Sequence, residues 1–296
     1  MSANEIKTAL VTGASSGIGY AVVKELVKSG FTVYACARRL DLLEQLSKEY
    51  EPNRVIPYAL DISNIEEIIQ LKAYLSTHLP HQRLDVLYNN AGQSCTMPAV
   101  DVTNERLNQL FQVNVIGHMN ITSQLCQFLI NSKGTIIFTG SLSGVCVFPF
   151  GAVYAASKAA IHQYARVLHA EMKMFDVRVI NAITGGVGTD IADTRPLPKS
   201  SPFYFPEGIE ALDNRKFMAA RNFPMSAEKY AEKVVKDILS PRDPVDVYRG
   251  TLASVVSWLM MFAPYWLVEW VVFKKFKLDA VEKALRQRRR EAEKQK

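Results

Sequence analysis

The chain has 296 residues, of which 48% are hydrophobic, and this is enough for one large α/β domain with a short appendix. The formal net charge of +6 lies in residues 274–296, where ten Lys/Arg stand against four Asp/Glu, so the rest of the chain is neutral and a nucleic-acid-binding face is not expected. Four cysteines (Cys36, Cys95, Cys126 and Cys146) stand singly without CxxC spacing, which predicts reduced thiols, no disulfide and no metal site.

The N-terminal segment is polar and leads directly into a β-branched run, Thr8–Thr12, so we expect no signal segment and a cytosolic start. A glycine-rich turn, Gly13–Gly19, follows the run, and apolar residues then recur at helical spacing. Such a strand, turn and helix can hold a nucleotide pyrophosphate on backbone N–H groups at the helix N-terminus. The same turn also satisfies GxSxG, which leaves open a lipase that uses Ser15 as its nucleophile.

A second buried strand is predicted over Thr32–Ala37, and Arg38 and Arg39 follow it directly. A carboxylate near this strand end would favour NAD, whereas arginine accommodates the 2′-phosphate of NADP. The two arginines therefore indicate NADPH as the cofactor. The alternative is a solvated charge pair at the start of a helix.

Four further strands are expected, over residues 55–60, 84–88, 134–140 and 177–183. Helical segments separate them, which predicts a parallel sheet with its ligands at the carboxyl ends of the strands. Asp61 and the sequence Asn89-Asn90-Ala91-Gly92 stand at two such ends. The long helical stretch 104–130 contains Asn114 and Gly117, which are poor helix formers, so we expect a local disruption there.

The helix predicted over residues 152–174 carries Tyr154 and Lys158 at i, i+4, which puts a phenol and an ammonium on one face. A nearby cation lowers the pKa of a tyrosine and makes it a better proton donor. Ser141 stands thirteen residues before Tyr154 and could hydrogen-bond the oxygen of a carbonyl under reduction. The alternative is an incidental pair on a surface helix.

Residues 190–225 lack clear periodicity and are expected to form a lid or wall beside the substrate. The aromatic and methionine side chains of this segment either contact an apolar substrate or pack the segment onto the core: Phe203, Tyr204, Phe205, Phe217, Met218 and Phe223. Five basic residues could meet a phosphate or simply be solvated: Arg195, Lys199, Arg215, Lys216 and Arg221.

Residues 251–273 are apolar except for Glu269 and are interrupted by Pro264. As one helix they would reach about 34 Å, enough to cross a bilayer core of about 30 Å, but neither half crosses alone. The basic residues 274–296 and a cytosolic nucleotide domain place both ends on one side, so we expect a hairpin membrane anchor that turns at Pro264. A helix that caps a dimer interface is the soluble alternative.

The motifs TGASSGIG, NNAG, a helical Asn, a Ser, YAASK and the loop ending at Thr189 stand in the order and spacing of the short-chain dehydrogenase/reductase family, which the chain resembles over residues 7–248. The resemblance implies a Rossmann-like α/β fold, a single doubly wound parallel sheet in residues 1–250 with a C-terminal hydrophobic extension. It also implies that Tyr154 is the general acid, that Lys158 tunes it and binds the nicotinamide ribose, and that Ser141 holds the substrate carbonyl.

Further roles come from the same resemblance. Asn114 would disrupt its helix and seat a water that relays protons to Lys158. The implied cofactor contacts are Gly13, Ser15, Ile18 and Gly19 along the pyrophosphate, Arg38 and Arg39 at the 2′-phosphate, Asp61 at the adenine, Asn90 at the adenosine ribose, and Val187 and Thr189 at the carboxamide. The family usually has Pro-Gly after the sixth strand, whereas this chain has Thr184-Gly185, so we expect a less rigid nicotinamide loop.

Four segments narrow the resemblance: VYACARRL, LYNNAGQSCT, SKAAIHQYAR and TGGVGTDIADTRPLP. They resemble fungal family members that reduce an acylated dihydroxyacetone phosphate with NADPH, and the expected product is a lysophosphatidate. The expected location is the cytosolic face of the endoplasmic reticulum and lipid droplets, with the mitochondrial outer membrane as a further site. Left open are a ketosteroid or ketosphingoid substrate, a lipid-surface structural protein with a vestigial site, and a homo-oligomer.

Overall fold

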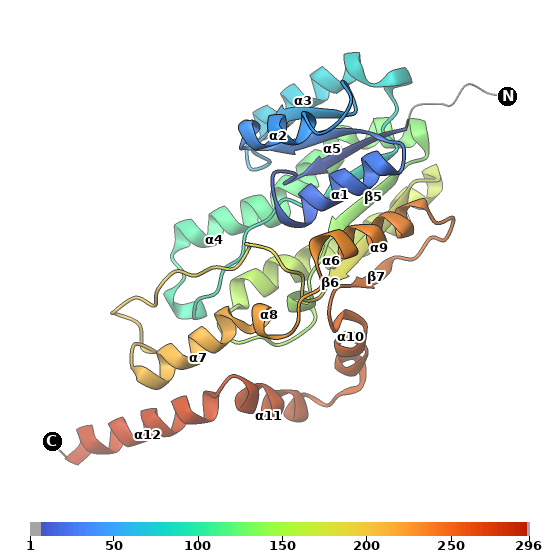
Figure 1. Ribbon diagram of the computed structural model, residues 1–296. Helices are drawn as coiled ribbons and strands as arrows, with labels where there is room; N and C mark the ends of the chain where they lie inside the picture. The colour runs from blue at the N-terminus through green and yellow to red at the C-terminus, as the bar shows by residue number, and fades with distance from the viewer. Residues whose placement is uncertain (1–6, 295–296) are drawn as a thin grey trace.

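In the computed structural model, residues 7–294 are described, so the expected polar N-terminal segment lies almost wholly outside them. They form one seven-stranded parallel sheet in the order β3-β2-β1-β4-β5-β6-β7 (Figure 1). The strands are β1 (Thr8–Thr12), β2 (Thr32–Ala37), β3 (Val55–Ala59), β4 (Val86–Asn89), β5 (Thr135–Thr139), β6 (Arg178–Thr184) and β7 (Asp246–Arg249). The reversal of strand order between β1 and β4 confirms the doubly wound sheet.

Two layers of helices cover the sheet, because alternate side chains of each strand point to opposite faces. On β1, Ala9 and Val11 join the core under α1, α2 and α9, whereas Leu10 joins the core under α3, α5 and α6. All three are fully buried, so both faces are closed to water. The helices are α1 (Gly17–Lys28), α2 (Leu40–Ser47), α3 (Ile65–His78), α4 (Asn104–Phe111), α5 (Gly117–Ser132), α6 (Ala152–Met172), α7 (Pro206–Lys216), α8 (Met218–Arg221), α9 (Ala227–Leu239), α10 (Ala253–Phe262), α11 (Tyr265–Lys275) and α12 (Leu278–Lys294).

The expected disruption of the long helix is confirmed. A π-helical turn, Gln112–Ile116, separates α4 from α5 and carries Asn114. Gly117 follows it, and a Cβ there would come within 2.4 Å of the Ile62 carbonyl oxygen, so only glycine lets the helix approach the loop after β3. Insertions of this kind are frequent at functional sites.

The segment 190–225 is more ordered than its sequence indicates, because it contains α7 and α8. Pro206 at the first turn and Glu207 beside it start α7, and Arg215 and Lys216 end it, which matches the helix dipole. The aromatic side chains of this segment differ in exposure, and only the packing role is seen for some of them. Phe205 is buried in a cluster with Leu212, whereas Phe223 is 90% exposed.

The C-terminal extension contains three helices, with Pro264 between α10 and α11. No helix within residues 7–294 is both long and apolar enough to cross a membrane. On α10 and α11 the large apolar side chains face outward, with Trp258 63% and Trp266 68% exposed. Pro264 therefore separates two short helices that leave much apolar surface uncovered, and the hairpin membrane anchor stays a prediction.

The basic segment after residue 273 is a docked helix rather than a free tail. α12 lies alongside α7 (Figure 1), and its Val281 is only 4% exposed in the cluster that includes Leu212. Arg288 stacks over the Phe205 ring at 4.7 Å, and Lys277 pairs with Glu210. α12 thus packs against α7, within the segment 190–225 that was predicted to form a lid or wall beside the substrate.

Candidate active site

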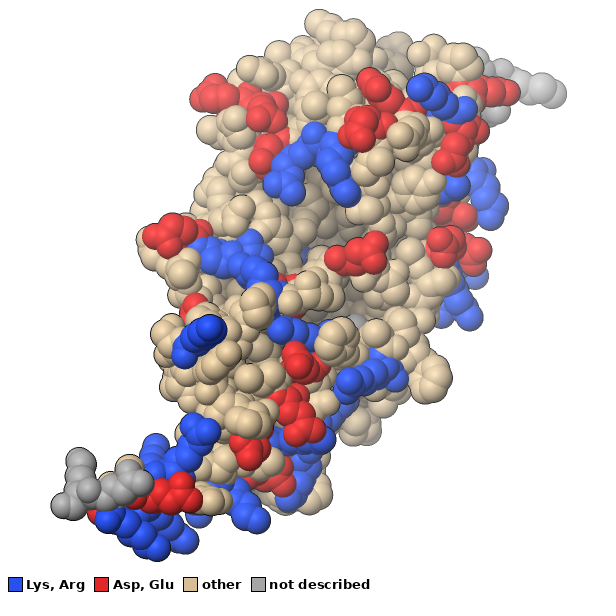
Figure 2. Space-filling model, turned by 60° about the vertical axis from the view of Figure 1, so that its left-hand side comes forward, with Lys and Arg blue, Asp and Glu red and all other residues tan. Residues whose placement is uncertain are grey.

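A pocket of about 520 Å³ opens at the carboxyl ends of the strands, on the hollowed face shown in Figure 2. Twelve of the fourteen predicted site residues line it: Gly13, Ser15, Ile18, Arg38, Arg39, Asp61, Asn90, Ser141, Tyr154, Lys158, Val187 and Thr189. Gly19 and Asn114 lie behind its wall. The fold thus brings residues from six strand ends to one site, as the switch point of an open α/β sheet requires.

The glycine turn forms a cradle that larger residues would fill. Gly13 has a φ of +66°, and a Cβ there would lie 2.8 Å from the Cα of Ala91. A Cβ on Gly19 would lie 2.3 Å from the Gly13 carbonyl oxygen. No side chain caps the N-terminus of α1 at Ser16, so its N–H groups are free to bind an anion. These residues fit a nucleotide pyrophosphate.

The next two strand ends carry the groups expected at the adenosine half of a cofactor. Arg39 donates hydrogen bonds to the hydroxyls of Ser15 and Ser16 at 3.0 and 3.2 Å. Neither Arg38 nor Arg39 pairs with a carboxylate in the described part of the chain, which leaves both charges available for a phosphate. Asp61 also lines the pocket, with one carboxylate oxygen accepting from Ser63.

The lipase interpretation finds no support in this geometry. A serine nucleophile needs a general base within hydrogen-bond reach, usually a histidine. The Ser15 hydroxyl instead accepts from Arg39, which cannot take a proton. Among the described histidines, His118 contacts Asn89 and Ala91, and His162 contacts Ser141, so neither serves Ser15.

The Asn90 side chain connects the ends of β1 and β5 through hydrogen bonds. Its side-chain amide donates to the carbonyl oxygens of Thr12 and Gly13 at 3.0 and 3.3 Å, and its side-chain oxygen accepts from Thr139 at 3.2 Å. The side chain therefore fixes the glycine turn against β5. Contact with the adenosine ribose stays a prediction for its pocket-facing surface.

Hydrogen bonds fix the loop after β6, residues 185–189, where the nicotinamide is expected. The absence of the family's proline had predicted a less rigid loop. Gly186 exchanges two backbone hydrogen bonds with Thr251, at 3.1 and 3.0 Å, and its carbonyl also accepts from Met225. Thr184, in place of the family's proline, bonds the buried Tyr230 hydroxyl at 2.7 Å. Hydrogen bonds to β7 and the segment after it thus replace the fixed φ of proline. Thr251, where the hydrophobic extension was predicted to begin, is thus hydrogen-bonded to the loop after β6.

Ser141, Tyr154 and Lys158 meet at one side of the pocket. Ser141 lies at the end of β5, and its backbone N–H donates to Nε2 of His162 at 3.0 Å. Tyr154 and Lys158 lie in the first two turns of α6, with the ammonium 5.9 Å from the phenol ring centroid. The Lys158 ammonium donates to the Thr139 carbonyl at 2.8 Å, which fixes its position.

Arg215 is a second cation that acts on Tyr154, besides Lys158, whose ammonium lies 5.9 Å from the centroid of the Tyr154 ring. Burial raises the pKa of Tyr154, and the Ser141 hydroxyl and the charge of Arg215 lower it. Lys158 is turned toward Thr139. The sequence did not indicate that Arg215 lies near Tyr154, because the packing of α7 beside α6 cannot be inferred from sequence spacing.

Asn114 is fully buried behind Lys158. Its side chain accepts from the backbone N–H of Gln93 at 2.8 Å and donates to the Gln93 carbonyl and the Ser157 hydroxyl at 2.9 and 3.1 Å. A Cβ on Gly92 would lie 3.5 Å from the Asn114 side-chain oxygen and 3.9 Å from the Lys158 ammonium. Glycine thus leaves room between the two groups, where the water relay is expected.

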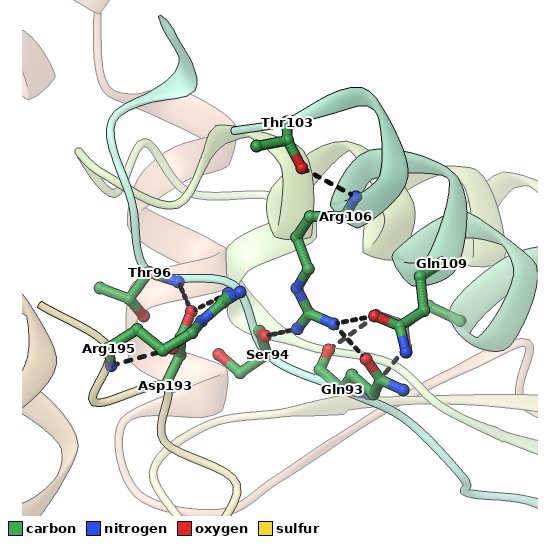
Figure 3. Close-up of polar contacts among 9 residues, drawn as sticks. Gln93, Ser94, Thr96, Thr103, Arg106, Gln109, Asp193 and Arg195 are labelled. Carbon is green, nitrogen blue, oxygen red and sulfur yellow. Dashed lines mark hydrogen bonds and ion pairs between the residues drawn. The ribbon is translucent and has the colours of Figure 1, made fainter. Parts of the chain in front are cut away.

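Hydrogen bonds and an ion pair connect α4 and the segment 190–225 to the loop after β4 (Figure 3). Arg106 donates to the side chains of Gln93 and Gln109 and to the Ser94 carbonyl. Asp193 accepts from the Thr96 backbone N–H at 2.9 Å and pairs with Arg195 at 2.7 Å. These ties fasten the start of the segment 190–225 to the loop after β4.

Residues 7–199 match the family described as short chain dehydrogenase. The chain belongs to the short-chain dehydrogenase family. It is 59% identical over 284 residues to NADPH-dependent 1-acyldihydroxyacetone phosphate reductase of Saccharomyces cerevisiae, covering 96% of each chain. It is 33% identical to a short-chain dehydrogenase of Hypocrea virens, covering 94% of this chain and 95% of that relative. A crystal structure of a short-chain dehydrogenase from Streptomyces avermitilis superposes with a TM-score of 0.78 at 25% identity, covering 94% and 99% of the two chains.

His162 was not predicted as a site residue of this short-chain dehydrogenase. Burial and the Lys158 charge lower its pKa to about 4, so the ring is neutral and its Nε2 accepts from Ser141. A Cβ on Gly140 would lie 2.6 Å from the same nitrogen, so glycine is needed for this approach. His162 therefore positions Ser141. The segment SKAAIHQYAR contains it, but without a signal that separates it from a core histidine.

Reduction by this short-chain dehydrogenase is expected to slow as pH rises through about 8. Burial lowers the pKa of Lys158 to about 8, so its charge is complete below that pH and is lost above it. His118 and His162 have pKa values lowered to about 3 and 4, and the pKa of Tyr154 is raised, so none of them titrates between pH 5 and 8.

The profile of kcat/KM for NADPH against pH measures this loss, and above pH 8 we expect roughly a tenfold decrease for each pH unit. Lys158→Arg, measured at high enzyme concentration, should remove the descending limb because its charge persists. A flat wild-type profile to pH 10 would show that the charge of Lys158 is not required.

Proposed function

We propose that this chain catalyses the NADPH-dependent reduction of 1-acyldihydroxyacetone phosphate to 1-acylglycerol 3-phosphate. The observation that carries the proposal is the 59% identity, over 96% of both chains, with the Saccharomyces cerevisiae NADPH-dependent 1-acyldihydroxyacetone phosphate reductase. The grouping of Ser141, Tyr154 and Lys158 beside a nucleotide cradle supports the same chemistry. These residues also disfavour a purely structural lipid-surface protein.

The chain's residues have distinct tasks in this reaction. NADPH, when bound, supplies the hydride that adds to the ketone carbon. The Ser141 hydroxyl, held by His162 through the adjoining backbone, orients the ketone oxygen. Tyr154 gives its phenolic proton to that oxygen as charge develops, which completes the alcohol. Lys158 would hold the cofactor ribose, and a proton relayed from the side of Asn114 through Lys158 would return to the Tyr154 phenolate.

The preference for NADPH over NADH rests on Arg38 and Arg39. Both line the pocket at the end of β2, and neither has a carboxylate partner among residues 7–294. Ala37 stands where an NAD-binding chain would carry the carboxylate for the ribose. The guanidinium groups supply charge-assisted hydrogen bonds that only the 2′-phosphate can accept.

The apolar surface of α10 and α11 is proposed to bind the cytosolic face of the endoplasmic reticulum membrane and the monolayer of lipid droplets, with the mitochondrial outer membrane as a further location. Helices of ten and eleven residues reach only about 15 Å, which suits one leaflet. Docking of α12 on α7 returns the chain to the catalytic domain and favours a hairpin over a span. The substrate would then enter from the lipid.

The proposed function is tested by turnover of the purified full-length chain on ketolipids with NADPH. We expect 1-acyldihydroxyacetone phosphate to be the preferred substrate over a ketosteroid or a ketosphingoid. Those two lipophilic ketones lack the phosphate that the basic residues of the segment 190–225 can meet. Preference for either one would replace the proposed substrate while leaving the reductase chemistry intact.

A further inference from the structure

The five basic residues of the substrate segment have different surroundings. Arg195 is paired with the buried Asp193, and Lys216 lies 3.6 Å from Asp213. Arg221 donates to the Asn214 side chain at 2.9 Å, and Lys199 is exposed to solvent. Arg215 differs from all of these because it is partly buried and, within residues 7–294, forms no hydrogen bond or ion pair.

The guanidinium of Arg215 lies beside the Phe148 ring and the start of α6. Its central carbon lies 5.3 Å from the centroid of the Phe148 ring, and its Nε is shielded from solvent without an acceptor. A Cβ on Gly151 would lie 3.4 Å from its Nη2. Gly151 is the residue before α6, whose first turn carries Tyr154, and the charge of Arg215 acts on that tyrosine.

This arrangement is unfavourable unless an anion completes it. A desolvated charge without a partner is costly, and burial lowers the pKa of Arg215. The guanidinium also faces the start of α6, where no side chain caps the N-terminus at Gly151 and the helix dipole adds positive potential. An anion at the start of α6 would be attracted by the Arg215 guanidinium and by the helix dipole. It would also accept a hydrogen bond from the Arg215 Nε, which has no acceptor.

We propose that Arg215 binds the phosphate of the lipid ketone and so selects phosphorylated substrates. This inference rests on the proposed function. In an acylated dihydroxyacetone phosphate, one methylene and one ester oxygen separate the ketone carbon from phosphorus. A carbonyl held at Ser141 and Tyr154 therefore brings the phosphate beside Tyr154, where the charge of Arg215 acts. Phe148 supports the guanidinium from the apolar side.

Arg215→Met tests the proposal, because methionine keeps much of the apolar stem and removes the charge. We expect kcat/KM for 1-acyldihydroxyacetone phosphate to decrease by roughly 10- to 100-fold, as for a lost charge-assisted contact. For the matching 1-acyldihydroxyacetone, which has the same ketone and no phosphate, we expect a change below about threefold. Arg221→Met on the neighbouring helix is the matched control and should leave both values near wild type.

Two outcomes would overturn the assignment. An equal decrease on both ketones would show that Arg215 acts through Tyr154 or the fold rather than through the phosphate. Unchanged values on both would show that Arg215 does not touch the substrate. Thermal unfolding and NADPH fluorescence of Arg215→Met provide the check that its fold and nucleotide binding persist.

A binding measurement separates this inference from the proposed function. Full-length protein saturated with NADP⁺ is titrated with glycerol 3-phosphate in a calorimeter, so the cofactor's own phosphate sites are filled. Wild type should bind and Arg215→Met should bind at least about tenfold more weakly. If wild type binds in this way but reduces neither ketone, the anion site stands and the proposed substrate fails. Equal binding by both proteins refutes the site whatever the substrate.

Discussion

Tyr154→Phe is expected to reduce kcat for ketone reduction by about 10²- to 10⁴-fold, the contribution of a positioned general acid. Phenylalanine keeps the ring against the cluster that contains Val153 and Phe150, so the fold should persist. Nucleotide binding should persist as well, because the glycine cradle and the Arg38–Arg39 pair lie elsewhere. Steady-state kinetics and NADPH fluorescence titration measure the two properties separately.

Tyr164→Phe is the matched control for this change. Tyr164 lies on the same helix, α6, with its ring 5.7 Å from that of Phe138, and it does not line the pocket. Its loss should leave kcat within about twofold of wild type, as expected for a substitution that removes no reacting group. Activity of Tyr154→Phe in that same range would end the assignment of Tyr154 as the proton donor.

Replacing the outward-facing rings of α10 and α11 is expected to release the protein from membranes. The fourfold variant changes Trp258, Phe262, Trp266 and Trp270 to glutamine, and all four side chains are exposed, so the folded core loses no packing. Burying a large apolar side chain contributes about 1.5–3 kcal/mol, so the four together favour lipid binding by several kcal/mol. Co-sedimentation with phosphatidylcholine vesicles should therefore decrease by at least about 10³-fold in partition coefficient.

A fourfold control variant changes exposed apolar residues of the catalytic domain instead: Val100, Val167, Met174 and Phe175. It should sediment with vesicles as wild type does. Sedimentation of the α10–α11 variant at the wild-type level would mean that the extension does not bind lipid. In sealed microsomes, an epitope after Lys296 should be digested by added protease if α12 returns to the cytosolic side, and its protection would indicate a straight span.

The cofactor half of the pocket was predictable because each of its residues follows directly after a predicted strand. The turn Gly13–Gly19 follows a strand, and in a parallel sheet every strand end meets the same edge. The six strands with β-branched or apolar runs were recognised within two residues. β7, Asp246–Arg249, was missed because it has four residues, of which Val247 alone is buried.

The substrate half depended on contacts that sequence spacing does not reveal. Arg215 reaches Tyr154 only because α7 packs beside α6. α12 was read as a tail because six of its residues are Lys or Arg, yet Val281 and its apolar neighbours dock it on α7. The basic charge of the helix was predicted correctly. Its narrow apolar stripe did not indicate docking, because the surface against which it packs is not visible in the sequence.

Turnover of three lipid ketones tests most directly whether this short-chain dehydrogenase reduces a phosphorylated lipid ketone with NADPH. Purified full-length protein in detergent micelles is given NADPH and, in separate reactions, 1-acyldihydroxyacetone phosphate, a ketosteroid and a ketosphingoid. We predict a kcat/KM for 1-acyldihydroxyacetone phosphate that exceeds the other two by about 10²-fold or more, since the anion site beside Tyr154 has no partner in them. Equal or faster turnover of the steroid or the sphingoid base would contradict the account.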